Sequence, residues 1–112
     1  MNKVKIFIDH IIENIIDVES FIKRVSKEEF FNNKEKQNAV IRSLEVIGEA
    51  VKNIPNEFRE KYSGVEWKEA AGTRDKITHH YFGVNLETVW EIVTINLPKL
   101  KEQMLKIKQD VQ

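Results

Sequence analysis

A regular stripe of branched apolar residues in the first quarter of the chain most constrains the fold. Its members recur in steps of four and three, the spacing that places side chains on one face of an α-helix. They are Val4, Ile8, Ile11, Ile15, Val18, Ile22 and Val25. Acidic residues interrupt the stripe throughout, so we expect neither a signal peptide nor a membrane span. The stripe predicts one long amphipathic helix.

A second stripe, in the middle of the chain, predicts another long helix. Its members are Val40, Leu44, Ile47, Val51 and Ile54. Either Asn32 or Asn33 can cap its start, and Pro55 ends it. Gly48 lies inside the stripe, and we interpret it as a place where two helices pack closely.

Short helices are predicted on either side of this central helix. Ser26 and Glu29 stand three residues apart, as in a capping box, which predicts a helical turn just before it. Pro55 fits the first turn of another short helix that runs to Tyr62. The Ser63–Gly64 pair should then break the chain direction.

The last third of the chain predicts two more helices. One extends from about Glu66 to Phe82, with Gly83 as its natural stop. Asn85 is a natural N-cap for the other, in which Pro98 removes a backbone hydrogen bond and should produce a kink. The apolar face of this last helix carries Leu86, Val89, Trp90, Val93, Leu97, Leu100, Met104, Ile107 and Val111.

These patterns predict an all-α fold, an antiparallel helical bundle of four to five main helices in a single domain covering residues 1–112. Cysteine is absent, which excludes disulfides and thiolate zinc sites. Lys plus Arg and Asp plus Glu each total 18 residues, so no global basic field favours nucleic acid. A soluble, cytoplasmic protein is the expectation.

The segment RDKITHHY, Arg74 to Tyr81, concentrates the chain's chemically versatile side chains. On a helix Asp75 and His79 share one line, so the carboxylate can fix the histidine tautomer and favour its protonated form. Arg74 and Tyr81 lie within about 20° of each other on a second line, whereas Arg74 and His79 are about 140° apart. Two copies of the helix about a two-fold axis would therefore pair the arginine and histidine more easily than one.

Such a pair suits cleavage of an RNA phosphodiester. His79 can take a proton from the ribose hydroxyl or give one to the leaving oxygen. Arg74 can neutralise charge on the phosphate in the transition state. Lys76 and His80 are further candidate RNA contacts. No metal or cofactor is expected, because the ribose supplies the nucleophile and the adjacent histidines point about 100° apart on a helix. The same residues are also typical of a solvated helix face.

The spacing of Arg74, His79 and Tyr81 forms the pattern RxxxxHxY, which resembles the motif of HepT-like toxins in the HEPN superfamily. The polar Asp75 after the arginine fits that pattern. Two residues depart from it. His80 stands where an acidic or small residue is common, and Thr73 stands where an apolar residue is common. The resemblance extends to the stretches Ala39–Pro55 (AVIRSLEVIGEAVKNIP), Trp67 and Val89–Leu100 (VWEIVTINLPKL).

The resemblance implies a homodimer with arginine–histidine sites facing each other across the interface. It also implies a metal-independent endoribonuclease that cleaves through the ribose hydroxyl and pairs with an MntA-like minimal nucleotidyltransferase antitoxin. That partner would add adenylate to Tyr81. Glu45 and Glu49 belong to a recurrent family stretch, and we expect them to form helix-surface or interface salt bridges.

Two other interpretations remain. The chain can be a non-catalytic helical dimer that binds a nucleotide or a nucleotidyltransferase, without chemistry of its own. It can also be an oligomerisation scaffold, in which substitutions in the motif act only through stability. Loss of RNA cleavage on His79→Ala would favour the ribonuclease.

Overall fold

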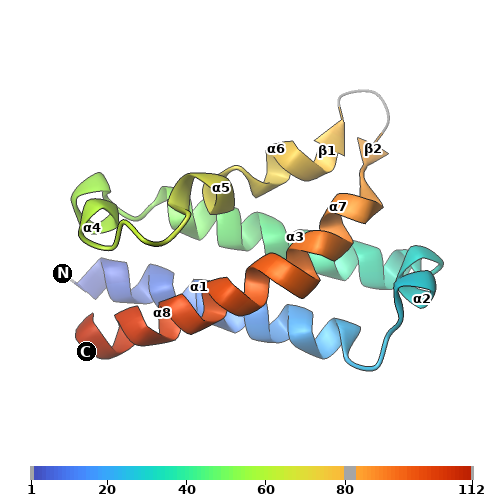
Figure 1. The fold of residues 1–112 in the computed structure, drawn as a ribbon, viewed down its shortest axis with the longest axis horizontal. Coiled ribbons are helices and arrows are strands. Elements are labelled where there is room, and N and C mark those ends of the chain that lie inside the picture. The colour runs from blue at the N-terminus through green and yellow to red at the C-terminus, as the bar shows by residue number, and fades with distance from the viewer. Residues whose placement is uncertain (1, 80–82, 112) are drawn as a thin grey trace.

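The computed structural model describes the backbone of residues 2–79 and 83–111 and the side chains of residues 3–77 and 83–111. Long helices lie side by side in alternating directions (Figure 1). They are α1 (Asn2–Ile22), α3 (Lys34–Lys52) and the rod formed by α7 (Leu86–Glu91), η1 (Ile92–Asn96) and α8 (Leu97–Val111). This arrangement confirms the predicted all-α antiparallel bundle.

The apolar stripe of α1 forms the centre of the bundle. Ile8, Ile11, Ile15 and Val18 are fully buried, and they pack against α3 on one side and α8 on the other. Burying such side chains contributes about 1.5–3 kcal/mol each relative to exposure. The prediction of one long first helix is therefore confirmed.

Local capping explains how the short helix α2 (Lys27–Phe31) and then α3 begin. The Ser26 hydroxyl accepts from the Glu29 N–H at 3.1 Å, and the Glu29 carboxylate accepts from the Ser26 N–H at 2.8 Å. The bonds from the Ser26 backbone and hydroxyl hold the pKa of Glu29 below its ordinary value. Asn33, rather than Asn32, caps α3 by accepting from the Lys36 N–H at 2.9 Å.

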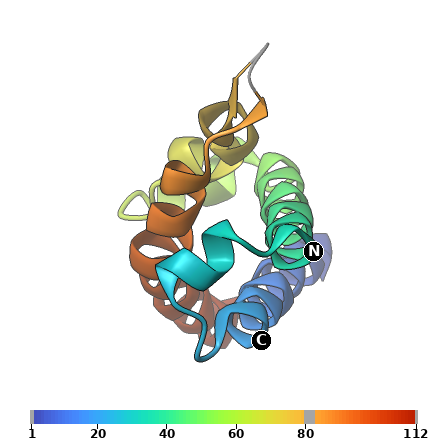
Figure 2. The same cartoon turned by 90° about the vertical axis from the view of Figure 1, so that its right-hand side faces the viewer.

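The structure contradicts the predicted helix from Glu66 to Phe82. After α4 (Asn56–Lys61) the chain forms α5 (Trp67–Ala71), α6 (Thr73–Ile77) and an antiparallel pair of strands, β1 (Thr78–His79) and β2 (Gly83–Val84). Phe82 lies outside the described residues. The strands pair Thr78 with Val84 and His79 with Gly83, and the hairpin projects from the bundle (Figure 2).

Two features explain why this helix breaks. Gly72 ends α5, and the buried Thr73 hydroxyl donates to the Ala70 carbonyl at 2.9 Å, a side-chain bond of the kind that bends helices. Further on, the Asn85 N–H donates to the Ile77 carbonyl at 2.7 Å, so that carbonyl is paired outside the helix. Gly83 adopts φ +81°, which only glycine reaches without strain.

The predicted interruption of the last helix is present as a π-helical turn. Pro98 has no N–H to donate, and the turn Ile92–Asn96 ends two residues before it. The Leu97 N–H donates to the Ile92 carbonyl five residues earlier, which lengthens the turn. As predicted, Asn85 caps α7 by accepting from the Thr88 N–H.

Gly48 lies where the backbone of α5 comes close to α3. A Cβ atom placed on it would lie 3.4 Å from the Ala71 carbonyl oxygen and 3.5 Å from that of Ala70. The interpretation of Gly48 as a close-packing position is confirmed. This contact holds the α5–α6 segment against α3 and so determines where the motif side chains of α6 emerge.

Candidate functional site

Helix α6 exposes three charged motif side chains in succession. Arg74, Asp75 and Lys76 are all exposed, whereas Thr73 before them and Ile77 after them are buried. The two buried residues anchor the helix against the bundle. The charged residues contribute little to the core and are free to contact a ligand.

Arg74 lies beside Glu45 of α3. Its Nε atom is 3.8 Å from a carboxylate oxygen of Glu45, and the arginine side chain is 73% exposed. No second ion pair to Arg74 occurs among the described side chains. An exposed pair of this kind contributes only about 0–1 kcal/mol to stability. It biases the orientation of the guanidinium while leaving its terminal nitrogens open to solvent. The expectation of a salt bridge is confirmed for Glu45.

An open hollow of about 380 Å³ surrounds this pair. Its lining comes from α3, from Ala71 at the end of α5 and from Arg74 itself. The charged side chains of α3 that line it are Arg42, Glu45, Glu49 and Lys52. With Arg74, the hollow thus has three cations and two carboxylates, and the local excess of positive charge suits an anion such as phosphate.

Sequence reasoning assigned no role to Arg42 or Lys52. The sequence did indicate that these two residues share one face of α3, because they and the glutamates between them follow steps of three and four. What the spacing did not show is that this face lies beside Arg74. That contact depends on the close approach of α5 to Gly48.

His79 does not continue the helix that carries Arg74 and Asp75. It belongs to β1 and is paired with Gly83 in the projecting hairpin. The predicted helical line joining Asp75 to His79 is therefore wrong, because helical spacing ends at Ile77. The helix that carries Arg74 also ends at Ile77, before the position of Tyr81. Tyr81 and His80 themselves lie outside the described residues.

Lys76 points away from the Arg74 hollow. It lines a separate cavity of about 270 Å³ on the other side of α6, together with residues of α3, α5, η1 and α8. Helix α6 thus separates two environments, one around Arg74 and one reached by Lys76. Within the described part of the chain, no three potential ligand side chains cluster as a metal site would require, and no helix is long and apolar enough to cross a membrane.

The sequence from residue 11 to residue 107 matches the family described as "Ribonuclease HepT-like". A "Probable ribonuclease HepT" of Thermococcus cleftensis is 41% identical over 105 residues, covering 94% of this chain and 96% of that protein. A "Putative RNase" of Methanocaldococcus jannaschii is 48% identical over 109 residues, covering 97% of this chain and 90% of that protein.

A longer relative from the same organism is named "Gamma-glutamylcyclotransferase and putative RNase". It is 49% identical over 108 residues, which cover 96% of this chain. The chain spans about half the length of that protein, namely 49%. No solved structure matches the chain.

Proposed function

Because this chain belongs to the HepT-like ribonuclease family, we propose that it is the toxin of a toxin–antitoxin module and a metal-independent endoribonuclease. The observation that carries the proposal is the exposed Arg74 guanidinium, positioned beside Glu45 in a hollow with excess positive charge. The names of two relatives, one a "Putative RNase" and the other a "Probable ribonuclease", support the same class of reaction.

The proposed reaction uses the RNA's own ribose as nucleophile. His79 accepts the proton of the 2′-hydroxyl, whose oxygen attacks the adjacent phosphorus. The bond from phosphorus to the 5′-oxygen breaks, and that oxygen takes up a proton from water, which leaves a 2′,3′-cyclic phosphate and a 5′-hydroxyl. Arg74 stabilises the negative charge that develops on the phosphate. Asp75 supports this site as a nearby carboxylate, although not through the helical pairing first predicted.

A homodimer remains part of the proposal. One copy of the hollow offers a small excess of positive charge, and a second copy across a two-fold axis would double it. Arg74 and His79 lie on two different short elements. In a dimer, Arg74 of one copy can face His79 of the other, so the two residues need not be aligned within one helix. Lys76 and His80 stay candidate RNA contacts in this arrangement.

Control by a partner is proposed at Tyr81. In the sequence this residue stands between β1 and β2, two positions after His79. An MntA-like minimal nucleotidyltransferase that adds adenylate there would place negative charge and bulk next to the histidine and so oppose RNA phosphate. Mass spectrometry of protein co-expressed with such a partner should find one adenylate on wild-type protein and none on Tyr81→Phe.

The central test is RNA cleavage by purified protein in the presence of a metal chelator. Arg74→Ala and His79→Ala should each lower the rate by at least about 100-fold, the lower end of what a catalytic group contributes. Lys106→Ala is the matched control, since it removes an exposed cation of α8 far along the chain. Circular dichroism should show the same helix content in every variant.

Two outcomes would contradict the proposal. Undiminished cleavage by His79→Ala would remove the histidine from the reaction. Intact RNA with the wild-type protein, combined with tight binding of a nucleotide or of a nucleotidyltransferase, would favour the alternative of a non-catalytic binding dimer. Cleavage that the chelator abolishes would contradict metal independence alone.

A further inference from the structure

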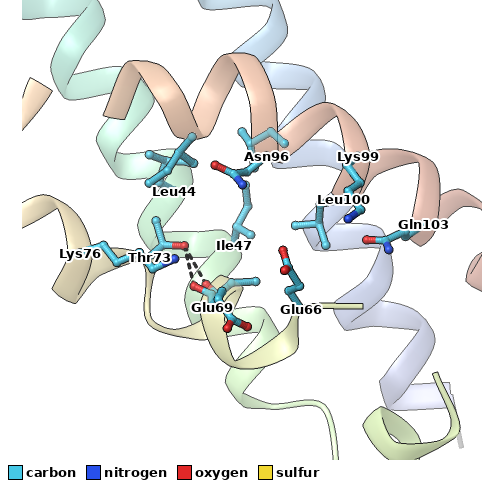
Figure 3. A pocket seen from close by; sticks show the side chains of 13 residues that line it. Leu44, Ile47, Glu66, Glu69, Thr73, Lys76, Asn96, Lys99, Leu100 and Gln103 are labelled. Carbon is cyan, nitrogen blue, oxygen red and sulfur yellow. Dashed lines mark hydrogen bonds between the residues drawn. The ribbon is translucent and has the colours of Figure 1, made fainter. Parts of the chain in front are cut away.

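The cavity reached by Lys76 has an apolar floor and a polar rim. It lies between α3, the α5–α6 segment and the η1–α8 rod, and its volume is about 270 Å³ (Figure 3). Aliphatic side chains from the long helices form the floor. They are Leu44, Ile47, Ile92, Leu97 and Leu100. Such a floor suits the flat faces of an aromatic ring better than a highly charged ligand.

Hydrogen-bond acceptors dominate one part of the rim. Glu66 and Glu69 contribute carboxylates, and the side chains of Glu66 and Gln103 approach the same space in Figure 3. The Gln103 amide nitrogen already donates to the Gly64 carbonyl at 3.3 Å, which leaves its oxygen as an acceptor. The Thr73 hydroxyl is committed to Ala70. A ligand with N–H donors can therefore pair with the carboxylates at this part of the rim.

The π-helical turn is a second, independent feature of this cavity. Its residues Ile92 and Asn96 both line the space, and Asn96 extends into it from above in Figure 3. Single π-helical turns within α-helices recur at functional sites, where they change the direction of a few side chains. Pro98, two residues after the end of the turn, accounts for its location.

Cations complete the rim. Lys76 approaches from α6 and Lys99 from α8, and neither belongs to an ion pair among the described side chains. Lys101 on the same helix differs, because its ammonium is bound to Glu19 at 2.8 Å. Two unpaired ammonium groups beside an aromatic-sized cavity suit phosphates on either side of a single base.

We propose that this cavity binds one unstacked base of the RNA substrate and favours a base that carries an exocyclic amino group. The volume is slightly below the range of about 300–1,000 Å³ typical of drug-sized ligands, so one ring system fits and a whole nucleotide does not. Carboxylates accept from the amino group of cytosine, and adenine and guanine have amino groups too. Uracil has none, so it is the base that the rim disfavours.

The inference rests on the proposed ribonuclease function and adds a base preference to it. Arg74 and Lys76 leave α6 on opposite sides, so the cleaved phosphate and the bound base belong to neighbouring nucleotides rather than to one. Proteins that recognise single-stranded RNA commonly bind unstacked bases in this way, by their edges and faces.

Cleavage of short single-stranded RNAs that differ only in carrying cytidine or uridine beside the cleaved bond tests the inference. Wild-type protein should show kcat/KM at least about fivefold higher for the cytidine RNA, since one good base contact is worth about 1–3 kcal/mol. Glu66→Gln should reduce that preference, because a neutral amide replaces the charged acceptor at the rim. Glu66 is exposed and its side chain caps no backbone group of α5, so the variant should keep its fold.

Glu102→Gln is the matched control, because it removes the same charge from an exposed position on α8 that does not line the cavity. It should retain the full cytidine preference. Equal rates for cytidine and uridine RNA in the wild type would overturn the inference. An equal loss of preference in both glutamate variants would do so too, since a general charge effect would then explain it.

A binding experiment separates this inference from the proposed activity. Cytidine 5′-monophosphate titrated into wild-type protein should shift the side-chain amide NMR signals of Asn96 and Gln103, and uridine 5′-monophosphate should do so at least about fivefold more weakly. If no RNA is cleaved but these shifts occur, the ribonuclease proposal fails and the base site stands. If RNA is cleaved but neither nucleotide shifts the signals, the base site fails alone.

Discussion

The bundle of α1, α3 and α8 and the segment from α5 to β2 are stabilised by different interactions. In the bundle, branched side chains such as Ile11, Ile15 and Val51 are fully buried. The α5–β2 segment has few such anchors, and polar contacts to backbone groups hold much of it in place. Trp67, for example, donates from its ring nitrogen to the Arg59 and Tyr62 carbonyls at 3.1 and 3.0 Å.

The bundle therefore provides most of the stability, and the α5–β2 segment carries the candidate functional side chains. Truncating a buried side chain of the bundle leaves a cavity in the core. Arg74, Asp75 and Lys76 are exposed, so they can be replaced without creating one. Short helices and a two-residue strand pair also allow the chain to change direction within a few residues. That is how α6 presents one cation to each of two separate hollows.

The largest expected effect on stability is in the bundle. Ile15→Ala should lower the free energy of unfolding by about 2–5 kcal/mol, because the substitution leaves a cavity between α1 and its neighbours. Urea denaturation measures it. Ile16→Ala is the matched control, since Ile16 is 47% exposed, and its effect should be much smaller. Similar losses for the two variants would show that α1 does not pack as described.

An intermediate effect is expected at the junction of the two regions. Asn85→Ala should cost about 0.5–2 kcal/mol, because it removes the oxygen that caps α7 while leaving the backbone bond to Ile77 in place. Thermal unfolding measures the loss. Asn85→Ser, which retains a capping oxygen, should recover most of it. If serine and alanine behave alike, the side-chain cap does not stabilise this junction.

The smallest effect is expected for the carboxylate beside Arg74. Glu45→Gln should hardly change stability but lower kcat/KM for RNA by up to about fivefold, the equivalent of the roughly 1 kcal/mol that an exposed pair contributes. Glu87→Gln, which breaks the shorter 2.7 Å pair with Lys27, is the control and should leave cleavage unchanged.

A double variant sharpens this last comparison. If Glu45 acts by orienting Arg74, then Glu45→Gln should have no further effect on cleavage in an Arg74→Ala background. Independent, additive losses would show that Glu45 affects RNA directly, and an unchanged rate in the single variant would remove it from the site.

Much of the bundle was predictable because its determinants are local. The stripe of α1, the capping box at Ser26 and the cap at Asn85 each depend on residues within one or two helical turns, and each has the predicted role. For the candidate site, the sequence predicted a set of residues whose roles stay predictions. The predicted geometry of the site was wrong, because the pattern through Ile77 reads equally well as a continuing helix.

By itself, the sequence determined that the long segments of the bundle are helical, which of their faces are buried and where several helices begin, since periodicity and capping act between near neighbours. The tertiary structure decided where α6 ends, that Arg42 and Lys52 surround Arg74, and that a cavity forms beside Lys76. The physical reason is that these features depend on groups far apart in sequence. The Ile77 carbonyl bonds to the Asn85 N–H, and α5 approaches α3 at Gly48, so neither outcome is encoded within one helix.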